Sequence, residues 1–191
     1  KLDKQELKYF KLKYKKRANL SPWKKITKIV LNTKQSVNIA IIGKYVNLKD
    51  AYKSLDEALI HGGISNKVKV NLIRIESDDL KSNEIKNRLK NISGLLIPGG
   101  FGKRGTEGKI SAIKFARENK IPFLGICFGM QMAIIEFARN KLKIKKAGSS
   151  ELDKKCYPVI GLINEWDKNG RIIKGTDKNL GGTMRLGLYE A

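Results

Sequence analysis

Polar and apolar positions repeat along this chain with two different periods, which predict strands and helices in alternation. Short apolar runs typical of strands cover residues 37–43, 67–75, 94–97 and 121–126. Segments with apolar residues at helical spacing lie between and after these runs, at about 50–62, 83–91, 108–120 and 130–140. This alternation predicts an α/β fold in which a mainly parallel sheet carries helices on both faces.

A few residues indicate where the helices begin and end. Ser21 and Pro22 suit the first positions of a helix that runs to about Asn32. Ser82 is suited to cap the short helix that follows it. Gly62 suits the end of the helix that starts near residue 50.

The chain divides into two predicted parts. Residues 1–36 are strongly basic with a helical pattern, and we expect them to connect the rest of the chain to an upstream domain. Residues 37–191 form the main domain, whose last part has β character at 157–163 and 170–175, with a turn at 167–170. The first residues contain neither Met nor an apolar signal segment, so we expect an internal part of a longer protein.

Composition narrows the class of protein. Hydrophobic residues make up 41% of the chain, which suffices for a packed core, and no apolar run approaches the roughly 18 residues of a membrane span. The two cysteines, Cys127 and Cys156, form no CxxC motif and no Cys/His cluster. We therefore expect no disulfide framework, no metal site, no membrane association and a cytoplasmic location.

The net charge raises the question of a nucleic-acid partner. The formal charge is +22, but the basic residues are mostly lysine, they are spread along the chain, and acidic residues stand between them. Lysine lacks the planar fork with which arginine binds phosphates and bases bidentately. This pattern favours a solvated, lysine-rich surface over specific nucleic-acid binding.

The strongest chemical signal is Gly125-Ile126-Cys127-Phe128-Gly129, at the junction of a predicted strand and helix. The spacing G-x-C-x-G is the thiol form of a nucleophile elbow. Glycines keep the sharp turn free of side chains, and the N–H groups of a helix N-terminus favour a thiolate. The N–H of Phe128 would point at the oxyanion that forms when Cys127 attacks a carbonyl, whereas the ordinary alternative is a buried structural cysteine.

A second glycine corner, "IPGGFGKRG", follows the preceding strand, and Gly100 is its best candidate for a second oxyanion donor. The carboxyl ends of parallel strands lie at one edge of a sheet, where ligands bind, so we expect the two corners to meet. Residues 100–105 also fit G-x-G-x-x-G formally. A dinucleotide fingerprint occupies the first strand–helix turn, which these residues do not, so the chain is not expected to bind NAD or FAD.

With both corners identified, the sequence resembles the class I glutamine amidotransferases, and more narrowly the C-terminal glutaminase domain of the CTP synthase family. The resemblance rests on "IGKYVNLKDAYKSLDEALIHGG", "PGGFGKRGTEGKISAIKFAREN", "PFLGICFGMQ" and "GGTMRLG". It implies a flavodoxin-like, three-layer fold. It also implies a domain that hydrolyses glutamine through a cysteinyl thioester and supplies ammonia to a synthetase domain.

The resemblance further implies the partners of the complete enzyme. The synthetase domain of this family is a ligase that aminates UTP to CTP with ATP and Mg²⁺, in pyrimidine biosynthesis, and GTP activates the coupling. The glutaminase domain itself needs no cofactor. The resemblance implies a homo-oligomer, a tetramer, for the full-length enzyme.

Site residues follow from the resemblance by position. Cys127 matches the nucleophile and Gly100 the oxyanion and glutamine contact. Glu151 matches the acid that receives the substrate's α-amino group, although from its sequence context alone it reads as a solvated surface residue. Thr183 and Arg185 fall in the segment linked to GTP activation. The glutamine-binding segment after the nucleophile comprises Phe128, Gly129, Met130 and Gln131.

The resemblance also implies a base that these residues do not supply. The family completes its catalytic triad with a His-x-Glu pair, whereas the single histidine here, His61, is followed two positions later by Gly63. We expect His61 to have no catalytic role and these 191 residues alone to be nearly inactive. Two alternatives stay open: another cysteine amidotransferase or DJ-1-like α/β cysteine hydrolase, and a non-catalytic basic binding module.

Overall fold

The computed structural model divides the chain into two compact units. It describes residues 2–13, 19–44, 46, 48, 50–78, 80–81, 83–161, 165–168 and 171–174. One unit comprises Lys1–Val37 and Ser54–Val70, and the other comprises Asn38–Lys53 and Asn71–Ala191. The second unit carries the functional candidates, apart from His61.

The first unit is mostly helical. It holds α1 (Leu2–Tyr9), α2 (Ser21–Asn32) and nearly all of α3 (Lys53–Ser65). Pro22 lies in the first turn of α2 as predicted, but Leu20 rather than Ser21 is the N-cap, and no side chain caps this helix. The prediction that Gly62 ends α3 is wrong, because the helix continues to Ser65, where Asn66 and Lys67 still bond back to it.

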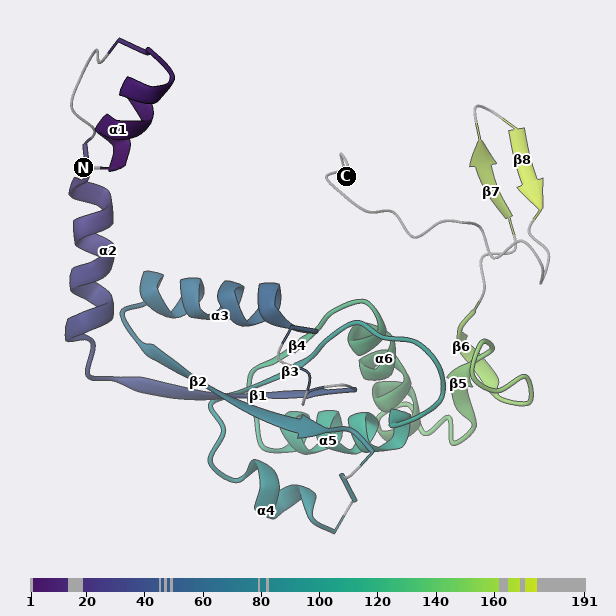
Figure 1. Ribbon diagram of the computed structural model, residues 1–191. Coiled ribbons are helices and arrows are strands. Elements are labelled where there is room, and N and C mark those ends of the chain that lie inside the picture. The colour runs from purple at the N-terminus through teal and green to yellow at the C-terminus, as the bar shows by residue number, and fades with distance from the viewer. Residues whose placement is uncertain are drawn as a thin grey trace. The chain divides into compact units, whose positions relative to one another are not determined.

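The main sheet has four strands in the order β2-β1-β3-β4 (Figure 1). Its members are β1 (Ser36–Gly43), β2 (Lys69–Glu76), β3 (Gly94–Ile97) and β4 (Phe123–Gly125). Strand β3 pairs in parallel with β1 on one side, where Ala40 lies opposite Leu95, and with β4 on the other. The predicted α/β fold with a mainly parallel sheet is confirmed.

Helices of the second unit pack against this sheet. They are α4 (Ile85–Leu89), α5 (Thr106–Glu118) and α6 (Phe128–Asn140). Helices α5 and α6 contact each other and also β3 and β4 (Figure 1). The core between them is aliphatic, and Ile97, Met132 and Ala112 in it are fully buried. Burial of this surface is the main stabilising term of the unit.

Two predicted elements differ from expectation. The strand at residues 121–126 was predicted to be buried, whereas β4 is only three residues long and Leu124 is 56% exposed, because β4 is the last strand of the sheet within the described residues. Helix α4 is also shorter than predicted, and Glu84 occupies its N-cap position. The predicted cap, Ser82, lies outside the described residues.

The last described part of the chain forms two small sheets. β5 (Ala147–Ser149) and β6 (Tyr157–Ile160) pair in parallel, whereas β7 (Glu165–Lys168) and β8 (Arg171–Lys174) form an antiparallel hairpin. The predicted β character is therefore confirmed for 157–160 and 171–174. Of the predicted turn at 167–170, the first two residues lie in strand β7, and the other two lie outside the described residues.

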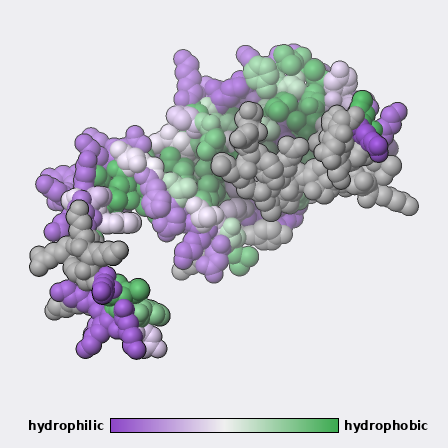
Figure 2. Space-filling model, turned by 90° about the horizontal axis from the view of Figure 1, so that it is seen from above, coloured by the Kyte–Doolittle hydropathy of each residue, from purple (hydrophilic) through white to green (hydrophobic). Residues whose placement is uncertain are grey.

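The surface of the described residues is mixed. On the face that Figure 2 shows, hydrophobic side chains form patches among hydrophilic ones. No helix in this part of the chain has both the length and the apolar character needed to cross a membrane.

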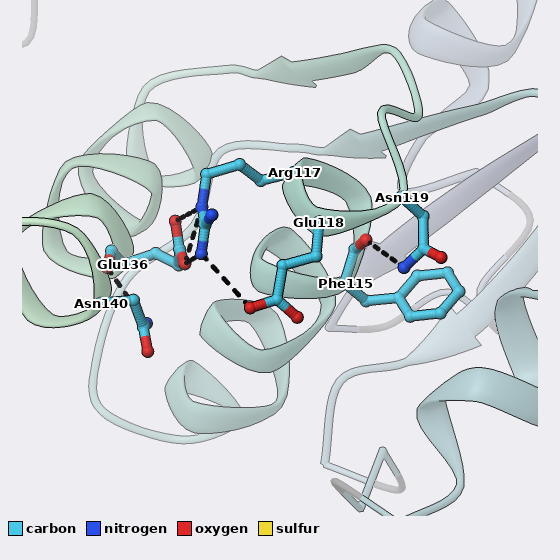
Figure 3. Close-up of polar contacts among 6 residues, drawn as sticks. All are labelled: Phe115, Arg117, Glu118, Asn119, Glu136 and Asn140. Atoms are coloured by element: carbon cyan, nitrogen blue, oxygen red, sulfur yellow. Dashed lines mark hydrogen bonds and ion pairs between the residues drawn. The ribbon is translucent and has the colours of Figure 1, made fainter.

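An ion pair between the half-buried Arg117 and the buried Glu136 joins α5 to α6 (Figure 3). Arg117 donates from Nε to Oε2 of Glu136 at 3.0 Å and from Nη2 to Oε1 at 2.8 Å. The Glu136 side chain is 1% exposed, so its negative charge is compensated by this bidentate contact. The hydrogen bond to Glu136 also raises the pKa of Arg117. Glu118 adds a longer contact of 3.7 Å to the same guanidinium.

Replacing Arg117 by Met should destabilise the protein strongly, because Glu136 would remain buried without its cation. We expect the free energy of unfolding to fall by roughly 3 kcal/mol, measured by urea denaturation at pH 7. Lys114, exposed on the same helix, provides the matched control, and Lys114→Met should change stability by less than about 0.5 kcal/mol. Equal effects of the two variants would contradict the assignment.

Candidate functional site

Cys127 lies between β4 and α6, directly before the helix, in a backbone conformation that L-residues rarely adopt. Its φ is 51° and its ψ is −104°, and the residue occupies the N-cap position of α6. Strain of this kind persists only where the surrounding structure enforces it, and it is common at functional sites. The thiol is exposed, so the alternative of a buried structural cysteine is wrong.

The two flanking glycines enforce this corner. A Cβ at Gly125 would lie 2.6 Å from the amide nitrogen of Met130, inside the first turn of α6. A Cβ at Gly129 would collide with the carbonyl oxygen of Ile97, at the end of β3. Helix and sheet therefore approach each other through backbone alone, as the G-x-C-x-G spacing predicts.

The second glycine corner lies beside the thiol. A Cβ built on Gly99 would be 3.8 Å from the Cβ of Cys127, so the loop after β3 reaches the elbow after β4. The N–H of Ile126 donates to the carbonyl of Ile97 at 2.9 Å, which holds the two strand ends together. The expected convergence of the two corners is therefore confirmed.

The two predicted backbone donors at this corner are unpaired within the described residues. Within the described residues, neither the N–H of Phe128 nor that of Gly100 makes a hydrogen bond, whereas those of Gly129 and Gln131 bond back to Ile126 and Cys127. Around Gly100 the space for a Cβ is open. Unpaired N–H groups beside an exposed thiol can donate hydrogen bonds to the oxyanion that forms on an attacked carbonyl. The roles of the two residues as oxyanion donors stay predictions.

The remaining predicted residues occupy different environments. Phe128 and Gly129 are buried, Met130 is exposed, and Gln131 is half-buried on α6. Glu151 is exposed in the turn after β5, a strand that contacts α6.

The structure does not bring the last three predicted residues together with Cys127 in one described unit. His61 is exposed on α3, in the first unit, whereas Cys127 belongs to the second. Thr183 and Arg185 lie outside the described residues.

Sequence reasoning missed a pair of buried lysines near the corner. Lys44 follows β1 directly and is 8% exposed, and Lys109 in α5 is 2% exposed. The Nζ atom of Lys109 lies 5.2 Å from the centre of the Phe128 ring, a cation–π contact to the residue after the nucleophile. The available signal was that Lys44 directly follows the first strand, at the edge of the sheet where ligands bind.

Burial is the main cause that lowers the pKa of Lys109 to about 8, and the positive charge of Lys44 acts in the same direction. The carboxylates of Asp78 and Glu76 oppose this shift. The two lysines are therefore electrostatically coupled, because the charge of Lys44 helps to lower the pKa of Lys109.

A cavity of about 440 Å³ lies elsewhere in this unit, between α5, α6 and the β5–β6 sheet. Its lining includes Met132, Arg139 and Cys156 but none of the predicted site residues. Cys127 is exposed and does not line this cavity, so the chemistry is assigned from the elbow.

Comparisons of this chain with family models, curated proteins and solved structures agree on one family. The family model for glutamine amidotransferase class-I matches residues 47–191. A solved structure, "Trypanosoma brucei CTPS - glutaminase domain with bound acivicin", is 35% identical with a TM-score of 0.60. The match covers 64% of this chain and 48% of that one.

Two curated relatives are similar over the whole chain. The CTP synthase of Pelagibacter ubique is 77% identical over 191 residues, and that of Zymomonas mobilis is 52% identical over 193 residues. Each match covers 100% of this chain and 36% of the relative. The chain thus spans about a third of the length of these relatives.

Gly129→Ala should disrupt the corner, because the new Cβ would meet the Ile97 carbonyl. We expect the free energy of unfolding to fall by roughly 1–3 kcal/mol in urea denaturation. Gly62→Ala is the matched control, since nothing lies within 4 Å of a Cβ there. This control should raise stability by up to about 1 kcal/mol, because alanine favours helix. A harmless Gly129→Ala would show that α6 and β3 are further apart.

Lys109 should make stability depend on pH. Its pKa is about 8 in the folded protein against an ordinary value of 10.5, so between these values the unfolded chain binds more protons, and its contribution to the free energy of unfolding rises with pH. Lys109→Met should stabilise the protein at pH 7 by roughly 2–3 kcal/mol, and this gain should shrink toward pH 10. Urea denaturation of both proteins at the two pH values measures it, and a gain independent of pH would contradict the assignment.

Proposed function

This chain belongs to the class I glutamine amidotransferases, and we propose that it hydrolyses the side-chain amide of glutamine through a thioester on Cys127. The observation that carries the proposal is the exposed thiol at a strained corner, next to two unpaired backbone N–H groups. The four residues after Cys127 and the turn at Glu151 would bind the substrate, as the family resemblance implies.

The proposed reaction has two steps. The Cys127 thiolate attacks the amide carbon of glutamine, and the tetrahedral oxyanion is held by the N–H groups of Phe128 and Gly100. The C–N bond then breaks, the nitrogen leaves as ammonia with the proton that the Cys127 thiol gave up, and a γ-glutamyl thioester remains on Cys127. Water attacks this thioester through a second oxyanion, and the products are glutamate and the free thiol.

The sequence supplies the nucleophile but no His-x-Glu pair. A triad that lacks its base loses several orders of magnitude in rate, and only a residual from the oxyanion donors and binding remains. We therefore propose that these 191 residues turn over glutamine poorly by themselves.

We further propose that the ammonia serves the amination of UTP to CTP. The support is the similarity to proteins named CTP synthase, of which this chain spans about 36%. A synthetase domain with ATP, UTP and Mg²⁺ would then be the partner, with GTP as activator, in a cytoplasmic homotetramer. The same similarity favours this reading over a DJ-1-like hydrolase or a basic binding module.

Labelling with a diazo-ketone analogue of glutamine tests the nucleophile. In the complete natural protein that carries these residues, we expect one label per chain, on Cys127, located by mass spectrometry of the digested protein. Cys127→Ala should abolish the label and glutamate release, because it removes the thiol that stands at the corner.

Cys156 offers the matched control for this experiment. It is the other free cysteine of the described residues, half-buried just before β6. Cys156→Ala should leave both labelling and glutamate release unchanged. Labelling of Cys156, or glutamate release that survives Cys127→Ala, would refute the proposed function.

A further inference from the structure

We propose that Lys44 is a positioning residue, whose ammonium group holds the glycine loop 99–102 so that the N–H of Gly100 faces the oxyanion. Its Nζ atom donates hydrogen bonds to the carbonyl of Phe101 at 2.5 Å and to that of Gly102 at 3.2 Å. This inference rests on the proposed glutaminase function. Lys44 acts through the loop and makes no contact with the reacting atoms.

The place of this contact in the sheet is informative. Lys44 follows β1, and the loop follows β3, its neighbour in the order β2-β1-β3-β4. From β1 the chain continues to one side of the sheet, to β2, and from β3 it continues to the other side, to β4. The gap between the carboxyl ends of β1 and β3 is therefore the expected ligand crevice of such a sheet. The hydrogen bonds of Lys44 therefore bridge the crevice beside the thiol.

The loop needs an external anchor. Three of its four residues are glycines, which lose more conformational freedom on ordering than any other residue, and Gly102 has a φ of 75°. Among the described residues, the hydrogen bonds that reach the carbonyls of residues 98–102 come from Lys44. The two peptide units that Lys44 holds are the second and third after the unit that carries the Gly100 N–H.

Lys44 is itself held in place. The hydroxyl of Tyr52 donates to the Lys44 carbonyl at 2.5 Å, and a Cβ at Gly43 would lie 2.7 Å from that hydroxyl oxygen. With only 8% of the residue exposed, the ammonium cannot hydrogen-bond freely with water. A buried charge is costly unless it is hydrogen-bonded, so the carbonyls of the loop and the ammonium depend on each other.

The test uses glutamate release by the complete natural protein. Lys44→Met keeps the bulk of the side chain but removes both hydrogen bonds. We expect kcat to fall by about 10–100-fold with KM within about threefold, since the loop would no longer present Gly100 at the developing oxyanion. Lys114→Met, at an exposed site in α5, should retain wild-type kcat and KM.

A second measurement separates positioning from general damage. Iodoacetamide alkylates a thiol by displacement at a tetrahedral carbon, which forms no oxyanion. Alkylation of Cys127 should therefore stay within about twofold of the wild-type rate in Lys44→Met, because access to the thiol is unchanged. Lys44→Arg, which retains a cationic donor, should recover at least part of the lost kcat, and it provides a second variant should Lys44→Met fold poorly.

Three results would overturn the inference. They are an unchanged kcat in Lys44→Met, an equal loss of kcat and of alkylation rate, and a Lys44→Arg variant no better than Lys44→Met. A wild-type protein that releases no glutamate would refute the proposed function, and this inference with it. Wild-type release together with unaltered Lys44→Met turnover would refute the inference alone.

Discussion

The approach of α6 to β3 through bare backbone is the constraint on which the site depends. Gly129 lies where any side chain would strike the Ile97 carbonyl, and Gly125 lies where it would strike the first turn of α6. With both positions reduced to backbone, the helix can begin immediately after the strand, and Cys127 must adopt a positive φ. The strain at one residue is thus supported by the packing of a whole helix against the sheet, with Met132 and Ile135 fully buried beneath it.

Because the helix and the sheet approach each other through backbone alone, the site apart from the thiol consists mainly of main-chain atoms. The corner presents the thiol as its nucleophile, and the groups that would stabilise negative charge are the N–H groups of Phe128 and Gly100, which are unpaired within the described residues. Backbone donors are effective only when their orientation is fixed before the substrate arrives. The N–H of Phe128 is fixed by the helix that follows it. Gly100 lies in a glycine loop without such support, so its orientation must come from elsewhere in the fold.

The sequence predicted those features that depend on local chemistry. Alternating periods predicted the parallel sheet, and glycine spacing predicted both corners and their meeting beside Cys127. Prediction from the sequence failed where the burial of a residue or the end of a helix depends on contacts with residues distant along the chain. Leu124 reads as a core residue but lies on the last strand of the described sheet, and Gly62 reads as a helix end although the helix continues to Ser65. Lys44 and Lys109 could not be distinguished from the other basic residues, because burial of a lysine depends on tertiary packing and has no sequence pattern of its own.

Lys44 and Lys109 show that the positive charge of this chain is not confined to solvated surface residues. An exposed lysine costs little to charge, since water solvates it, and most of the excess behaves in this way. A buried lysine must be compensated, and Lys44 is compensated by two carbonyls of the glycine loop, while burial and Lys44 itself lower the pKa of Lys109 to about 8. The ammonium of Lys44 is therefore buried, at a cost in desolvation free energy, beside the loop that presents Gly100. That cost is understandable if the orientation of the loop, rather than the stability of the fold, is what the buried ammonium serves.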